Sequence, residues 1–339
     1  MNGSELTVKI KEFLTPQSES VFPQRRPMGD ERFGDIVLRF RDLQYATKLP
    51  DAAIIGVPQD IGVNRNFGRT GAALAPDAIR RAFYKLTTFA GKTTLSADKF
   101  SIVECGNITV EGLSLEEIHR RQEQAVWLLL KAGITPIILG GGHDIAWPNG
   151  QALAKIDASY GVLNIDAHPD VRPLDAGKGH SGTAFRQILE NKENPLPTGA
   201  FVEFGIQSFA TSVFFLDFLR SKQARIVFYD DIRRNGFDTS VRDVFDYLAS
   251  KARSLYTSFD IDSCASAYAP GASAPSTLGF TAEEICRAAY IAGKNPAVRL
   301  IDIVEVNPNF DADNRTAKLA AIMMAQFISG LAERKFGIN

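Results

Sequence analysis

The chain has 339 residues, with 38 Lys or Arg against 39 Asp or Glu, so its formal net charge is -1. A balance this even argues against nucleic acid or an acidic membrane surface as the main partner. The length suffices for one large α/β domain or for two smaller ones.

The cysteines and the N-terminal segment bear on the compartment. Cys105, Cys264 and Cys286 are widely spaced and form neither a CxxC pair nor a disulfide framework, which is typical of a reducing compartment. Segment 1–14 lacks a signal-peptide pattern. No apolar run reaches the roughly 18 residues of a membrane-spanning helix. We therefore expect a cytoplasmic protein without a membrane partner.

The order of the predicted elements indicates an α/β fold. Residues 1–50 are polar and irregular, and we expect them to form an arm packed on a single domain, residues 51–339. Short apolar runs predict strands at 52–57, 101–104, 134–139, 161–165, 201–205, 225–229, 255–259 and 298–304. Helical patterns lie at 76–86, 115–132, 144–154, 240–253, 281–292 and 315–331. Apolar strands that alternate with helices predict a mostly parallel sheet covered on both faces.

Four motifs stand at the ends of predicted strands. GGGHD occupies 140–144, DAHPD 166–170, SFDID 258–262 and EVNP 305–308. Open parallel sheets bind their ligands at the carboxyl ends of the strands, so we expect these motifs to meet at one site.

The side chains of these motifs suit divalent metal ions. Asp166, His168 and Asp170 are spaced i, i+2, i+4, which places them on one face of an extended chain. Asp260 and Asp262 repeat this arrangement from another strand. Carboxylates with one or two imidazoles suit Mn²⁺ better than a thiolate-preferring metal. Two such ions about 3.5–4 Å apart share a bridging water and lower its pKa.

Each motif also has an ordinary structural explanation. DAHPD is compatible with a solvated turn, and GGGHD with a strand-to-helix turn in which Asp144 is the N-cap. The glycines before His143 permit a tight turn and a close approach of the backbone. Because acidic groups gathered at the end of a buried strand repel one another, and a dication removes this repulsion, the combination favours a metal centre.

Together, in this order, the motifs resemble the signatures of the ureohydrolase family, which comprises arginases, agmatinases and formimidoylglutamases. The resemblance runs from about Ile55 to Leu331 and includes GVPQD at 56–60 and GAALAPDAIR at 71–80. It implies a three-layer α/β/α sandwich with a mostly parallel eight-stranded sheet (arginase-like). It also implies two Mn²⁺ ions per subunit, with Ni²⁺, Co²⁺ or Fe²⁺ as alternatives, and a homo-oligomer.

The resemblance implies roles for individual residues. The implied metal ligands are His143, Asp166, His168, Asp170, Asp260 and Asp262. Asp170 would also accept a proton from the bridging water, whose hydroxide would attack the amidine carbon. Glu305 would hydrogen-bond an amidinium or guanidinium group, although an ordinary salt bridge at a strand end is an equal alternative.

Within the family, segment 179–189 (GHSGTAFRQIL) is similar to the SGTxFRxxL stretch of formimidoylglutamases. The implied reaction is hydrolysis of the linear amidine N-formimidoyl-L-glutamate to L-glutamate and formamide, a step of histidine degradation. One alternative is hydrolysis of another guanidino acid, and a second is a non-catalytic relative that binds a ligand or a partner.

A substrate with two carboxylates requires cations in its pocket. Arg172 follows DAHPD closely and Arg186 follows the Ser-Gly-Thr turn, and the planar fork of arginine suits carboxylates. Arg65 and Arg69 are weaker candidates. Ser181 is a further substrate-binding candidate.

Departures from the family pattern bear on the substrate. Ser181 replaces a His of arginases and agmatinases, and His180, one residue earlier, is a candidate for proton transfer. Arginases carry an acidic residue near Ala210 that recognises an ammonium group, and its absence argues against arginine. Gln207 replaces a usual Arg, and 264–266 (CAS) lacks the family Asp-Pro, which questions the order of that loop.

Overall fold

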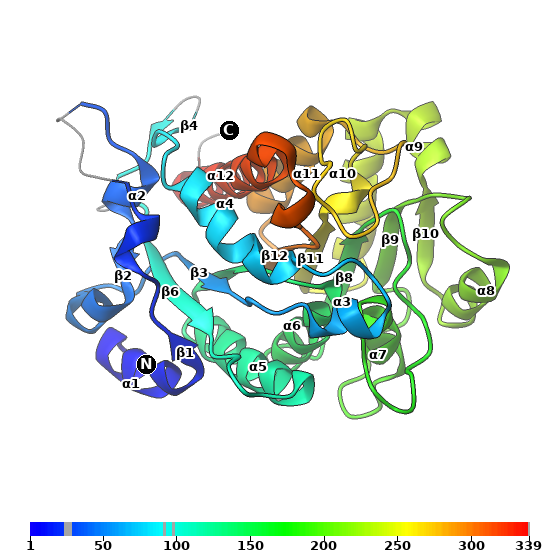
Figure 1. Ribbon diagram of the computed structural model, residues 1–339, viewed down its shortest axis with the longest axis horizontal. Helices are drawn as coiled ribbons and strands as arrows, with labels where there is room; N and C mark the ends of the chain where they lie inside the picture. The colour runs from blue at the N-terminus through cyan, green and yellow to red at the C-terminus, as the bar shows by residue number, and fades with distance from the viewer. Residues whose placement is uncertain (24–28, 91–92, 97–98, 338–339) are drawn as a thin grey trace.

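The computed structural model describes residues 1–23, 29–90, 93–96 and 99–337. A central sheet is covered by helices on both faces (Figure 1), which confirms the predicted three-layer α/β/α sandwich. Each predicted strand is present. They are β3 (Ala52–Gly56), β6 (Ile102–Ile108), β7 (Thr135–Leu139), β8 (Tyr160–Ile165), β9 (Phe201–Ile206), β10 (Arg225–Phe228), β11 (Ser254–Asp260) and β12 (Val298–Val304).

The strand order brings the four motifs together. It runs β1-β6-β3-β7-β12-β11-β8-β9-β10, and the eight predicted strands are parallel throughout. Two short strands pair with β6 and widen the sheet to ten, β1 (Leu14–Thr15) antiparallel and β2 (Leu38–Arg39) parallel. Because β11 and β12 lie between β7 and β8, the carboxyl ends of the four motif-bearing strands are adjacent.

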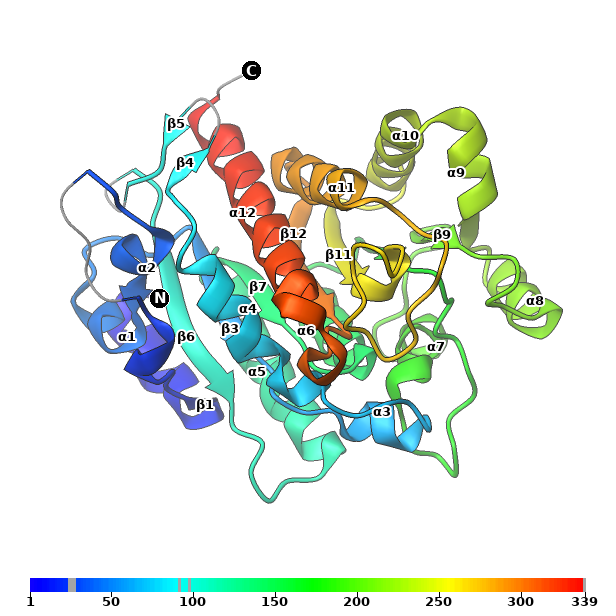
Figure 2. The same cartoon turned by 45° about the horizontal axis from the view of Figure 1, so that its top comes forward.

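Helices cover the two faces separately, as Figures 1 and 2 show. One face carries α5 (Leu115–Lys131), α6 (Ala146–Ala154) and α7 (Ala184–Glu190). The other carries α4 (Ala75–Phe83), α10 (Phe237–Ala249), α11 (Ala282–Lys294) and α12 (Arg315–Phe336). Within the residues that the structure describes, no helix combines the length and the apolar character needed to cross a membrane.

Several short helices were not predicted. They are α1 (Gly3–Ile10), α2 (Phe33–Ile36), α3 (Ile61–Arg65), α7, α8 (Val213–Ser221) and α9 (Tyr229–Asn235). Helices α3, α7, α8 and α9 begin without a side-chain cap hydrogen bond, although Asp60, Thr183 and Ser212 stand at the N-cap positions of the first three. Helix α1 contacts α5, so the N-terminal stretch that was expected to be irregular contains a packed helix.

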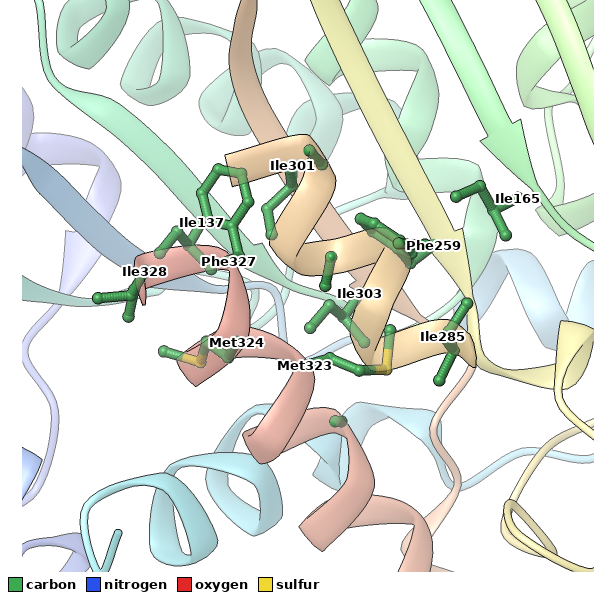
Figure 3. Close-up of a cluster of buried hydrophobic side chains, with 14 of the residues drawn as sticks. Ile137, Ile165, Phe259, Ile285, Ile301, Ile303, Met323, Met324, Phe327 and Ile328 are labelled. Atoms are coloured by element: carbon green, nitrogen blue, oxygen red, sulfur yellow. The ribbon is translucent and has the colours of Figure 1, made fainter. Parts of the chain in front are cut away.

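Side chains along β12 alternate between the two faces of the sheet, so one face receives apolar residues and the other receives a buried carboxylate. Ile301 and Ile303 point toward α11 and α12, where they lie near Met323 and Phe327 (Figure 3). Asp302 points to the opposite face and hydrogen-bonds to Asn149 of α6. The period of two along a strand explains this division.

Candidate metal centre

The structure brings the six predicted ligands together at the carboxyl ends of β7, β8 and β11. They form two groups, His143, Asp166, Asp170 and Asp260 in one and Asp166, His168 and Asp262 in the other. In each group the ligand atoms lie within 4.8 Å of one another. The GGGHD motif at 140–144 and the SFDID motif at 258–262 therefore contribute to one cluster although they are far apart in the sequence.

The first group surrounds the imidazole of His143. Its Nδ1 lies 3.0 Å from Oδ2 of Asp170 and 3.1 Å from Oδ2 of Asp260. Oδ2 of Asp166 is 3.3 Å away. Gly141 permits this turn, because a Cβ there would lie 1.6 Å from the backbone oxygen of Gln59.

Asp166 is shared by the two groups. Its Oδ2 faces His143, whereas its Oδ1 lies 3.6 Å from Nδ1 of His168 and accepts a 2.7 Å hydrogen bond from the His168 backbone N–H. Nδ1 of His168 is also 3.3 Å from Oδ2 of Asp262. One carboxylate thus offers an oxygen to each group, as a bridging ligand does.

The cluster contains more buried carboxylates than the two imidazoles can neutralise. Burial, reinforced by neighbouring carboxylates, raises the pKa of Asp260 well above its usual range. Burial likewise raises the pKa of Asp262 to about 7. The charge of Asp262 in turn raises the pKa of His168 to about 12. Buried like charges oppose one another's ionisation, and a divalent cation relieves this conflict.

The donor set fits such a cation. Nδ1 of His143 and Oδ1 of Asp262 are buried and have no hydrogen-bond partner among the described residues. Oxygen and imidazole nitrogen donors without sulfur suit Mn²⁺. Cys264 is buried and lies two residues after Asp262, but neither ligand group includes it.

Glu305 connects the cluster to a cavity. Its Oε1 accepts a 2.8 Å hydrogen bond from the His143 backbone N–H, whereas Oε2 has no partner among the described residues. Burial raises the pKa of Glu305 well above its usual range. Glu305 and Asp170 have φ values of 62° and 43°, a left-handed conformation that is strained outside glycine and is often found at functional sites.

The cavity has a volume of about 300 Å³ and is lined by Asp170, Glu305 and two arginines. Arg69 is held by backbone oxygens of Ala272 and Ser273. Arg172 is exposed and forms no salt bridge with any carboxylate in the described part of the chain. The wall also includes Ser181, whose Oγ accepts a hydrogen bond from Asn66, and Ala210.

Three other predicted residues have different surroundings. Arg186 does not line the cavity; it donates to the Val171 carbonyl and pairs with Glu190. Arg65, a weaker candidate, pairs with Glu116. His180 is buried, and its Nδ1 accepts a hydrogen bond from the Gly182 N–H; burial lowers its pKa.

The loop that lacks the family Asp-Pro is ordered by its backbone. The Ala265 N–H donates to the Phe280 carbonyl, and the Ser266 N–H donates to the Ser276 carbonyl. Gln207 also holds this loop through hydrogen bonds with Leu278 and Ser276. Asp144, considered as an N-cap, instead accepts hydrogen bonds from His119 and Gln59.

A buried polar row below the cluster was not predicted. Asp302, Ser258, Asn164 and Glu203 occupy paired positions across β12, β11, β8 and β9. All four are fully buried. Burial raises the pKa of Glu203 well above its usual range. Carboxylates that interrupt apolar strands, as in VRLIDIV and FVEFGI, were the available sequence signal.

Comparisons with known proteins agree with this geometry. The sequence model of the Arginase family matches residues 50–330. A formimidoylglutamase of Hahella chejuensis (strain KCTC 2396) is 35% identical over 287 residues, covering 82% of this chain and 85% of that protein. One of Aromatoleum aromaticum is 33% identical over 294 residues, covering 84% of each. The crystal structure of Trypanosoma cruzi formiminoglutamase with Mn²⁺₂ matches with a TM-score of 0.80 and 32% identity, covering 90% of this chain and 99% of that one.

Proposed function

Since this chain belongs to the arginase family, we propose that it is a binuclear manganese hydrolase of linear amidines. Its proposed reaction is N-formimidoyl-L-glutamate and water to L-glutamate and formamide. The observation that carries the proposal is the opening of the six-ligand cluster onto a cavity that also contains Glu305 and Arg172. Relatives named formimidoylglutamase support the choice of substrate.

The proposed ion sites correspond to the two ligand groups. His143, Asp166, Asp170 and Asp260 would hold one ion, and Asp166, His168 and Asp262 would hold the other. When bound, two Mn²⁺ ions polarise a water and lower its pKa toward neutrality.

Acidic groups on the cavity wall would act on the water and on the amidine. Asp170 presents a carboxylate to the cavity, and we propose that it takes the proton of the attacking water. Oε2 of Glu305 would accept a hydrogen bond from the amidinium group and orient its carbon. His180 would transfer protons only through Nε2, because its Nδ1 is already an acceptor.

The carboxylates of the substrate would bind to the arginine side of the cavity. Arg172 has no protein carboxylate partner among the described residues, and its planar fork can accept a substrate carboxylate. Ser181 would contribute a hydroxyl. Arg186 would support this wall indirectly, since it binds the carbonyl of Val171, next to Arg172.

The wall also bears on the main alternative, a guanidino acid with a free ammonium group. Ala210 lines the cavity where arginases would require an acidic partner. An ammonium group beside Arg69 and Arg172 would meet like charge, which disfavours arginine.

The direct test measures glutamate and formamide release from N-formimidoyl-L-glutamate by the Mn²⁺-loaded protein, with arginine, agmatine and guanidinobutyrate in parallel. Selective turnover of the first compound is the expected result. Turnover of a guanidino compound alone would overturn the substrate. A melting temperature that does not respond to Mn²⁺, together with no turnover, would support a non-catalytic relative.

The wider setting belongs to the same proposal. The reaction would be a step of histidine degradation, carried out in the cytoplasm by a homo-oligomer. Light scattering of the purified protein and fractionation of cells test these two expectations.

A further inference from the structure

Asp302 is a buried carboxylate without access to the cavity. It accepts hydrogen bonds from Ser258 Oγ at 2.6 Å, from Asn149 Nδ2 at 2.8 Å and from the hydroxyl of Tyr256. Among the described residues no backbone N–H donates to this carboxylate, so its donors are three side chains from β11 and α6. Because an ionised carboxylate can only accept hydrogen bonds, each of these three side chains must donate to Asp302.

The neighbouring groups fix these directions independently. Oδ1 of Asn149 accepts a 2.8 Å hydrogen bond from Gln122 Nε2, which turns the Nδ2 of Asn149 toward Asp302. The hydroxyl of Ser258 gives its one proton to Asp302. Ser258 Oγ can therefore only accept from Nε2 of His143, which lies 2.9 Å away.

This direction determines the tautomer of His143. In the neutral ring, a proton held on Nε2 leaves the lone pair on Nδ1, and Nδ1 is the atom that faces Asp166, Asp170 and Asp260. The outer hydrogen bond of a metal-binding histidine sets its tautomer and ring orientation. We propose that Asp302 is a positioning residue of the metal centre, which acts through Ser258 to keep Nδ1 of His143 ready for an ion.

The inference rests on the metal centre of the proposed function, so its test measures metal binding as well as turnover. Mn²⁺ is titrated into the metal-free protein by calorimetry for wild type, Ser258→Ala and Asp302→Asn. We expect both variants to lose about 10–100-fold in affinity at one of the two ions. Tyr256→Phe is the matched control, because it removes a hydrogen bond to the same carboxylate but leaves the Asp302–Ser258–His143 line intact.

A second readout reports the tautomer directly. ¹⁵N chemical shifts of His143 should show Nε2–H in the metal-free wild-type protein above the pKa of His143, and a mixture of tautomers in Ser258→Ala. Against the opposing effect of burial, hydrogen bonding to Asp166, Asp170 and Asp260 raises this pKa well above its usual range. Ser258→Thr retains a hydroxyl and should restore both the tautomer and the affinity. If Asp302→Asn does not fold, Ser258→Ala, which removes a single oxygen atom, carries the test.

The outcomes separate the two proposals. Mn²⁺ affinity that is unchanged in Ser258→Ala, or lowered equally in Tyr256→Phe and Asp302→Asn, would overturn the positioning role. A wild-type protein that binds no Mn²⁺ would instead overturn the metal centre itself.

Discussion

Two groups of buried carboxylates lie at different places on the sheet. Near one edge, Glu104 on β6 accepts hydrogen bonds from Arg80 Nε at 2.9 Å and Nη2 at 2.8 Å, and Tyr84 donates to the same carboxylate. Arg80 is fully buried and also donates to Asn107. At the central strand ends, the metal-centre cluster instead gathers carboxylates around two imidazoles.

The comparison distinguishes a buried carboxylate with a structural role from one that binds an ion. A carboxylate that has its own cation and donors within the fold is a structural element. A set of carboxylates that exceeds the protein cations around it is incomplete, and it indicates a bound ion. Variants that remove one charge from each region should therefore have opposite consequences.

The largest effect is expected for Asp170→Asn. Loss of the proposed proton acceptor should lower kcat by about 10²–10⁴-fold while the fold is retained. Asn tolerates the left-handed backbone that Asp170 adopts, so the loop geometry should persist. Steady-state kinetics alongside metal analysis provide the measurement. Turnover near the wild-type rate with full metal content would remove Asp170 from the mechanism.

In the edge region, Arg80→Met should reduce the free energy of unfolding by about 3–5 kcal/mol, because it leaves Glu104 buried without its cation. Urea unfolding of the metal-free protein measures this loss. Under conditions in which the variant is folded, Mn²⁺ should still raise its melting temperature.

The contrasting variant is Asp262→Asn, also in the metal-free protein. Because the pKa of Asp262 is raised from its usual value to about 7 in the folded protein, its ionisation lowers the stability progressively as the pH rises through the range between these two values, and the whole penalty is present above pH 7. At pH 8 the variant should be at least as stable as wild type. A loss comparable to that of Arg80→Met would contradict the proposed distinction between the regions.

A smaller effect is expected on the cavity wall. Arg172→Ala should raise KM for N-formimidoyl-L-glutamate by about 10–100-fold, the contribution of a charged hydrogen bond. KM for a neutral amidine should change little. Arg186→Ala is the control, since its guanidinium lies outside the cavity lining. Equal changes for both substrates would exclude Arg172 from the carboxylate site.

The last prediction concerns the pH dependence of Mn²⁺ binding. The pKa of His168 is raised to about 12 by Asp262, so its ring is protonated in the metal-free protein at neutral pH. Ion binding must displace that proton, and affinity for Mn²⁺ should rise with pH by about tenfold per unit for each proton released. Calorimetry in buffers of different ionisation enthalpy counts these protons. An affinity that is flat between pH 6 and 8 would contradict the displacement.

The strands and the clustering of the motif residues could be predicted from the sequence, because both depend on local patterns. Apolar runs predicted β3 and β6–β12, and the spacing within DAHPD predicted that Asp166, His168 and Asp170 would lie close together. The direction of Arg186 could not be predicted, because it depends on Glu190 and on the ring of Phe218, which α8 supplies. The bonds of Asp302 depend on strand pairing, which a single strand does not encode.

The polar row described above also has a consequence for folding. Its members come from positions 164, 203, 258 and 302, so the row exists only when β8, β9, β11 and β12 are aligned at once. A slip of one residue in any of these strands would turn its side chain to the opposite face. The metal centre would then be able to bind ions only late in folding. The time course of metal uptake during refolding would therefore report when the central strands reach their native alignment.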